Sequence, residues 1–225
     1  MAPLVAFNPP LGPTLSHCHP EQVTLHMKEK AFSLSGDDFT VKTVSGMGIC
    51  KCKGKILSVS DKKGQSRGDV LLTTLSHAFT THRYVDSSWL MRRSLVFTDV
   101  HDKEIFALKN KHFTIHKSFH AEDPHGKDLF VVKGEFAVLA SKSTVHFKNA
   151  SDGHEVELEV RGDWFDRSAN ITFGGQPVAH ISRSFFNVRE IFADKDTYFV
   201  HVAPNVDLTM IAALCVCLDE EETEK

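Results

Sequence analysis

The most constraining feature of the sequence is an apolar segment near its C-terminus. From Leu208 to Leu218, eleven residues, the only polar side chain is Thr209. A helix that is apolar on every face must lie in a protein core or in a membrane. As a helix the segment rises only about 16 Å, roughly half the hydrocarbon thickness of a bilayer. It is therefore predicted to be a short helix buried on all sides.

Polar residues mark both ends of this predicted helix. Asp207 is placed to cap the N-terminus, and Pro204 and Asn205 interrupt the chain just before it. The acidic run from Asp219 to Glu222 is expected to mark the return to solvent. A central β-strand is the alternative, since strands tolerate Val and Cys well and Ala less well.

Composition and charge limit the kind of protein. Of the 225 residues, 41% are apolar and 24% charged, as in an ordinary globular protein. Barrels of this length are commonly one domain. The net charge of −3 predicts no nucleic-acid partner for the whole molecule. The charge is uneven, however, because residues 1–125 carry +4, residues 126–225 carry −7, and residues 42–67 alone carry +6.

Cysteine usage and the N-terminus bear on localisation. Five cysteines are an odd number in a chain too large to need disulfides, which fits a reducing compartment. Residues 1–20 have neither the basic region nor the apolar region of a signal peptide. No stretch reaches the roughly 18 apolar residues of a membrane span. We therefore expect a cytoplasmic monomer, peripheral to a membrane if it associates with one.

Outside the C-terminal segment, the chain has the pattern of many short strands. Short apolar or alternating runs are separated by turn signals, such as Gly174-Gly175, which predicts a hairpin. The predicted strands are 23–27, 31–34, 39–44, 49–53, 56–60, 69–75, 95–98, 105–108, 112–119, 129–132, 136–139, 144–148, 155–161, 171–173, 178–181 and 197–202. Apart from the C-terminal segment, only residues 80–91 and 185–192 have any helical pattern.

A closed barrel with a helix inside accommodates both features. Closure removes unpaired strand edges, and the helix fills a bore too wide for side chains alone. Residues 22–222 are therefore predicted to be one mainly β domain, a closed antiparallel barrel of about twelve strands around the C-terminal helix. Residues 1–21 include five of the eight prolines and are predicted to be a leader that either packs on the barrel or frays. Residues 223–225 form a tail.

The best candidate binding site is a basic run made up of Lys51, Lys53, Lys55, Lys62, Lys63 and Arg67. The first three are spaced by two, so on a strand they project from one face. The other three follow in or beyond the next turn. The set is predicted to bind clustered phosphates, each lysine contributing on the order of 1 kcal/mol near an anionic membrane. The alternative is a solubilising face that prevents edge aggregation.

Other reactive side chains give weaker signals. Cys50 and Cys52 would share the strand face opposite the lysines, without the spacing or second pair that zinc needs. Cys215 and Cys217 would be about 200° apart on a helix and could not face one metal ion. All four are expected to be small buried hydrophobes. The fourteen histidines are expected at the surface, with a pH response or adventitious metal binding as the alternative.

No catalytic pattern is present in the sequence. A nucleophile elbow, a P-loop, an EF-hand loop and an H-E-x-x-H motif are all missing. We therefore expect no enzymatic activity, no cofactor and no metal centre.

Three blocks of sequence are specific enough to indicate a family. Residues 26–42 read HMKEKAFSLSGDDFTVK, residues 53–61 read KGKILSVSD, and residues 198–207 read YFVHVAPNVD before the apolar helix. Together they resemble the LURP-one-related family over about residues 22–222, with the likeness fading around residues 66–93. The lipid-binding and cation-binding residues of tubby and scramblase relatives do not align here, so none is transferred.

The resemblance implies the tubby C-terminal fold, a twelve-stranded barrel around a hydrophobic helix. It also implies binding of phosphoinositide headgroups, as in known tubby domains, and plant members of the family are associated with defence and stress. The expected function is therefore non-enzymatic binding of anionic phospholipid or phosphoinositide headgroups. The alternative is a protein-interaction scaffold in a stress or defence-type pathway, with no small ligand.

Overall fold

The computed structural model describes residues 3–28, 39–57, 92–111, 118–135, 141–163, 168–182 and 197–223. These residues form strands β1 (Val23–Lys28), β2 (Phe39–Thr43), β3 (Gly48–Leu57), β4 (Arg92–Thr98), β5 (Glu104–Lys111), β6 (Ser118–Glu122), β7 (Asp128–Glu135), β8 (Ser141–Lys148), β9 (Glu155–Asp163), β10 (Ser168–Phe173), β11 (Gln176–Ser182) and β12 (Thr197–Val202), followed by helix α1 (Leu208–Thr223).

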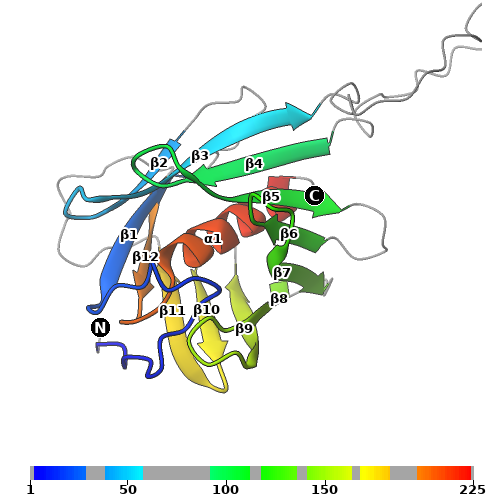
Figure 1. The fold of residues 1–225 in the computed structure, drawn as a ribbon. Coiled ribbons are helices and arrows are strands. Elements are labelled where there is room, and N and C mark those ends of the chain that lie inside the picture. The colour runs from blue at the N-terminus through cyan, green and yellow to red at the C-terminus, as the bar shows by residue number, and fades with distance from the viewer. Residues whose placement is uncertain are drawn as a thin grey trace, which may run out of the picture.

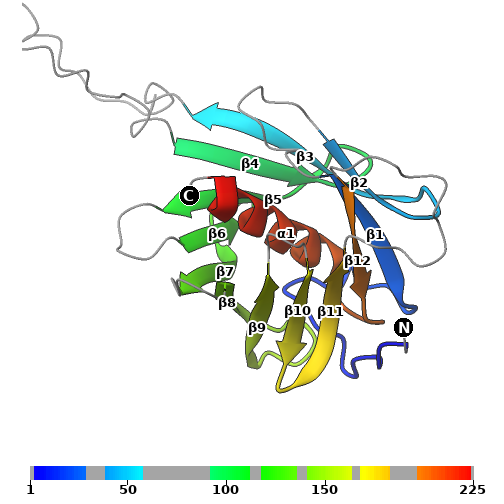
Figure 2. The same ribbon diagram turned by 180° about the vertical axis from the view of Figure 1, so that it is seen from behind.

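The twelve strands close into one barrel with α1 inside it (Figures 1 and 2). Every strand pairs antiparallel with its neighbours in sequence. The ring closes where β1 pairs with β12 along its whole length, from Val23↔Val202 to Lys28↔Thr197. The predicted fold class, a closed antiparallel barrel around a C-terminal helix, is confirmed.

Alternating side chains explain why these segments form barrel strands. In β9, Val156, Leu158 and Val160 are buried while Glu157 between them is exposed, as the sequence pattern predicted. Between β10 and β11, Gly174 and Gly175 both have positive φ, 54° and 85°. Left-handed φ at both central residues is what a two-residue hairpin requires, so the predicted turn is confirmed.

Several strand boundaries differ from the sequence prediction, and two of these differences have a clear structural cause. β3 is continuous where strands 49–53 and 56–60 were predicted, because it pairs with β4 at every residue from Lys51 to Leu57. Gly54 interrupts the side-chain pattern without interrupting the backbone ladder. Of the predicted strand 112–119, only residues 118 and 119 are described. They begin β6, which extends to Glu122 because the buried side chain of Ala121 continues the alternation. Predicted strands 31–34, 69–75 and 136–139 lie outside the described residues. So do residues 80–91 and 185–192, the two other stretches with some helical pattern.

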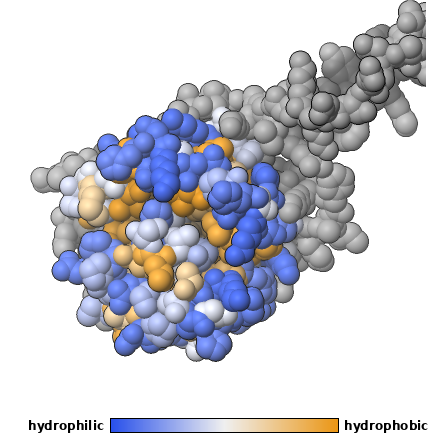
Figure 3. All heavy atoms as spheres, in the orientation of Figure 1, coloured by the Kyte–Doolittle hydropathy of each residue, from blue (hydrophilic) through white to orange (hydrophobic). Residues whose placement is uncertain are grey.

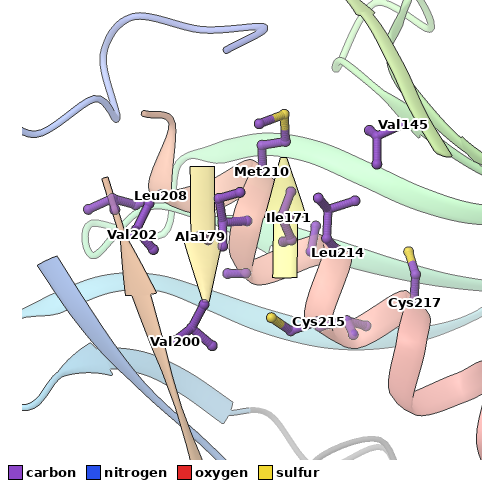
Figure 4. Packing of buried hydrophobic residues seen from close by; sticks show 14 of the residues in the cluster. Val145, Ile171, Ala179, Val200, Val202, Leu208, Met210, Leu214, Cys215 and Cys217 are labelled. Atoms are coloured by element: carbon purple, nitrogen blue, oxygen red, sulfur yellow. The ribbon is translucent and has the colours of Figure 1, made fainter. Parts of the chain in front are cut away.

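Helix α1 is enclosed from Leu208 to Leu218, where no side chain is more than 4% exposed. Inward-facing residues of the strands form the walls, and Figure 4 shows several of them gathered around the helix. The segment is thus a buried helix and not a central strand. It continues to Thr223, past its predicted end. Glu is a good helix former, so the acidic run extends the helix instead of ending it.

The described part of the leader, residues 3–21, packs against the end of the barrel where β12 leads into α1 (Figure 1). Phe7 and Leu11 are buried, at 6% and 2% exposed. The Leu11 backbone N–H donates to the carbonyl of Asn205 at 2.8 Å, and the Leu208 N–H donates to the carbonyl of His17 at 3.1 Å. Of the two behaviours predicted for the leader, packing is the one observed.

Asp207 joins the leader to the helix. Its Oδ1 accepts hydrogen bonds from the backbone N–H groups of Thr209 and Met210, at 2.9 and 3.2 Å, which confirms the predicted N-cap. The Thr209 hydroxyl also donates to Oδ1, at 2.7 Å. Oδ2 accepts from the N–H and hydroxyl of Thr14, at 3.3 and 2.6 Å. A Cβ at Gly12 would lie 2.4 Å from the Asp207 Cβ, so only glycine fits there.

Candidate functional site

The outer face of β3 carries two of the six predicted basic site residues. Lys51 and Lys53 lie on this face with their side chains 29% and 43% exposed. Cys50 and Cys52 alternate with them and are buried inside the barrel. The predicted separation of lysines and cysteines onto opposite faces is therefore present.

The structure describes the side chains of only two of the six predicted residues. Lys55 belongs to β3, but its side chain is not among those described, and residues 62, 63 and 67 lie outside the described ranges. That the six act as one site stays a prediction.

Lys51 and Lys53 converge on a single carboxylate. The Nζ atom of Lys51 lies 2.9 Å from Oδ2 of Asp102, and that of Lys53 lies 3.3 Å from Oδ1. The hydrogen bond from Lys51, with a smaller contribution from the one from Lys53, holds the pKa of Asp102 below its usual range. We call Lys51 and Lys53 the lysine clamp. Each lysine of the clamp contacts one oxygen of the same carboxylate. Two ammonium groups could contact two oxygens of a phosphate in the same way.

The turn between β4 and β5 positions Asp102. Oδ1 of Asp99 accepts hydrogen bonds from the backbone N–H groups of His101 and Lys103, at 2.8 and 2.9 Å. These two hydrogen bonds keep the pKa of Asp99 below its usual range, and the bond from Lys103 contributes more than the bond from His101. The Asp102 N–H donates to the Asp99 carbonyl at 3.2 Å, which completes the turn.

The turn between β6 and β7 repeats this architecture with one instructive difference. Asp123 accepts from the N–H groups of His125 and Lys127, both at 2.9 Å. The left-handed position is Gly126 there, with φ 84°, whereas it is Asp102 in the first turn, with φ 64°. Glycine adopts this conformation more readily than aspartate. The turn itself does not need a carboxylate at this position, since the second turn has none. The carboxylate of Asp102 instead pairs with Lys51 and Lys53.

The cysteines have the apolar role that was predicted for them. Cys50, Cys52, Cys215 and Cys217 are all buried, and none of the five cysteines forms a disulfide. Burial raises the pKa of Cys50 to about 12, with a smaller contribution from the nearby carboxylate of Asp207. A thiol with that pKa stays protonated and is a poor nucleophile or metal ligand. In the described part of the chain, no three His, Cys, Asp or Glu side chains gather to hold a metal ion.

A shallow groove of about 410 Å³ lies between the leader and the barrel, and the sequence did not predict it. Phe7 and Pro9 line it from the leader, and Phe173 lines it from the hairpin between β10 and β11. Asp152 and Glu155 add carboxylates at the turn between β8 and β9. No local pattern could have shown it, because its two walls are far apart in the sequence.

Known proteins resemble this chain over most of its length. The family described as LURP-one-related matches residues 76–219. "Protein LURP-one-related 15" of Arabidopsis thaliana is 23% identical over 215 residues, covering 92% of this chain and 84% of that protein. "Protein LURP-one-related 10" of the same plant is 21% identical, covering 92% of this chain and 94% of that protein.

A solved structure also resembles this chain. It is the X-ray structure of an Arabidopsis thaliana protein, with a TM-score of 0.53 and 18% identity, covering 93% of this chain and 96% of the other. At that identity the likeness concerns the fold alone. Among the helices in the described ranges, none is long and apolar enough to cross a membrane.

Proposed function

The chain belongs to the LURP-one-related family, and we propose that it is a non-enzymatic, cytoplasmic tubby-like protein that binds anionic phospholipid or phosphoinositide headgroups at a membrane surface. The observation that supports this proposal is the lysine clamp. Two ammonium groups on the outer face of the barrel converge on one pair of carboxylate oxygens. A headgroup phosphate offers at least two oxygens at a similar spacing, and it competes with Asp102 for the same two donors.

The strength of the interaction follows from the number of charges. Asp102 neutralises one of the two positive charges of the clamp, so the three side chains together carry a net charge of +1. Each lysine near an anionic leaflet is worth on the order of 1 kcal/mol, so the clamp alone binds weakly. Lys55, Lys62, Lys63 and Arg67 are proposed to add to the same basic surface. Binding should therefore need an anionic membrane and should weaken as salt is raised.

Charge reversal of the clamp tests this function. In flotation with the full chain, we expect binding at low salt to vesicles containing phosphatidylserine or a phosphoinositide, and none to phosphatidylcholine alone. The double variant Lys51→Glu/Lys53→Glu should lose most of that binding. Both side chains are partly exposed, so the fold should survive, which thermal unfolding followed by circular dichroism can verify.

A control variant with the same net charge distinguishes binding at the lysine clamp from general electrostatic attraction of the protein to the membrane. Lys133→Glu/Lys148→Glu reverses two exposed lysines on β7 and β8, and it should retain binding. Equal loss in the two double variants would reject the clamp. Absence of binding by the unmodified chain at low salt would reject the lipid function.

The alternative function is a protein-interaction scaffold, and the groove beside the leader favours it. The groove combines apolar residues such as Phe173 with the carboxylates of Asp152 and Glu155, and Phe173 is itself exposed. Figure 3 shows hydrophobic residues exposed among hydrophilic ones on one face of the molecule. Absence of vesicle binding would leave the scaffold as the better account.

A further inference from the structure

Three exposed apolar side chains lie in two turns beside the lysine clamp. Val44 and Met47 belong to the turn between β2 and β3, and they are 37% and 47% exposed. Val100 belongs to the turn between β4 and β5, which also carries Asp102, and it is 42% exposed. The described part of the chain exposes six large apolar side chains, so half of them belong to these two turns. We call Val44, Met47 and Val100 the apolar turn patch.

The two turns are neighbours at one end of the barrel. A Cβ on Gly48, at the start of β3, would lie only 3.1 Å from Cγ1 of Val100, so the second turn packs against the base of the first. Both turns lie on the same side of the molecule in Figure 1 and again in Figure 2. The lysine clamp belongs to the same region, since its partner Asp102 lies two residues after Val100. The apolar turn patch and the lysine clamp are therefore parts of one surface.

Several backbone polar groups of each turn are bonded within the turn itself. The hydroxyl of Thr43 accepts a hydrogen bond from the Met47 N–H at 3.1 Å and lies 2.7 Å from the hydroxyl of Ser45. The Gly46 N–H donates to the Thr43 carbonyl at 2.9 Å. In the second turn, the Asp99 carboxylate accepts from two backbone N–H groups. Backbone groups without a partner are costly where water is scarce, so these bonds suit both turns to a lipid interface.

We propose that the apolar turn patch inserts into the boundary between headgroups and acyl chains of an anionic membrane, while the lysine clamp contacts a headgroup. Such insertion presupposes the proposed function, since it places the same site against the same lipid partner. Residues 42–53 include two of the three patch residues and carry three lysines and no acid. Apolar side chains flanked by lysines fit an anionic membrane surface, because buried apolar area and positive charge both strengthen binding there.

Phe173 is an exposed apolar residue with the opposite surroundings. It is 37% exposed, the same as Val44, but the carboxylates of Asp152 and Glu155 line the groove beside it. An anionic membrane would repel those carboxylates. Phe173 ends β10, and the turn between β10 and β11 lies half the ring of strands away from the turn between β4 and β5. Phe173 therefore provides a matched control position.

Tryptophan fluorescence with phosphatidylserine vesicles tests the insertion. In the full chain, Met47→Trp places a tryptophan in the apolar turn patch, and Phe173→Trp places one at the control position. Both variants keep the two native tryptophans, so they differ only in the added one. On binding vesicles, the emission of Met47→Trp should shift to shorter wavelength and should be quenched by lipids with brominated acyl chains. The response of Phe173→Trp should match that of the unmodified chain.

Polar substitution gives a second readout. Met47→Gln/Val100→Thr leaves every charge in place, and it should weaken binding to the vesicles about tenfold, because two apolar side chains no longer enter the interface. Phe173→Ser should bind as the unmodified chain does.

Flotation of the same samples separates failure of the insertion from failure of lipid binding. The insertion is overturned if the unmodified chain floats with the vesicles but the Met47→Trp emission does not respond, or if Met47→Gln/Val100→Thr binds as tightly as the unmodified chain. It is also overturned if the Met47→Trp emission shifts with protein concentration in the absence of vesicles, because a second copy of the chain then covers the patch. Absence of flotation by the unmodified chain would reject both the insertion and the lipid function.

Discussion

Ala212→Asp is expected to abolish folding, and so is Leu214→Asp. Both residues are enclosed by the barrel, at 0% and 1% exposed. Figure 4 shows Leu214 among the buried side chains of the core. An isolated charge there would have no partner, which costs more than most single substitutions. Since a typical domain is stable by only about 5–15 kcal/mol, the native state should not be populated. Far-UV circular dichroism and size-exclusion chromatography of the purified variants measure this.

A matched substitution at the surface controls for the added charge. Val5→Asp also replaces an apolar side chain with a carboxylate, at a residue that is 68% exposed, and it should fold normally. If Ala212→Asp kept near-native stability, the helix could not be enclosed as described.

Asp207→Ala is expected to lower the free energy of unfolding by about 3 kcal/mol or more. The substitution removes the N-cap of α1 and leaves buried donors of Thr209 and Met210 without their acceptor. Each buried donor left unsatisfied costs roughly 1–3 kcal/mol. It also breaks both bonds from Thr14, which tie the leader to the helix. Urea unfolding at equilibrium measures the change.

A second variant separates the cap from the leader contact. Thr14→Val removes only the hydroxyl that bonds to Asp207 and should cost about 1–2 kcal/mol. The double variant with Asp207→Ala should be less destabilised than the sum of the two, because the residues share a contact. A loss below about 1 kcal/mol for Asp207→Ala would show that the carboxylate does not hold the leader and helix together.

Much of the architecture follows from local patterns in the sequence. The segment from Leu208 to Leu218 has no polar face, so it could only be buried, and it is. The alternation in β9 identified which side chains face inward, and the spacing of Lys51 and Lys53 identified their shared face. The blocks that resemble the LURP-one-related family pointed to the same barrel, and the family match confirms the resemblance.

Features that depend on contacts distant in sequence could not be predicted. The spacing of the lysines indicated a basic face but not that Asp102, some fifty residues later, neutralises part of it. The apolar turn patch depends on the packing of one turn against another, and the docking of the leader depends on Asp207. One signal was available, because residues 99–103 and 123–127 repeat the pattern Asp-x-His-x-Lys. A comparison of the two turn sequences would have shown that Asp102 occupies the position that is Gly126 in the second turn.

The most direct test of the lysine clamp is the effect of Asp102→Asn on binding to anionic vesicles. Asparagine tolerates the left-handed conformation, so the turn should be kept while the competing charge is lost. Binding at low salt should become about fivefold tighter, whereas Asp128→Asn, the same change of charge on β7, should have a smaller effect. Unchanged or weaker binding by Asp102→Asn would contradict the account, because Asp102 would then not occupy the place of the headgroup.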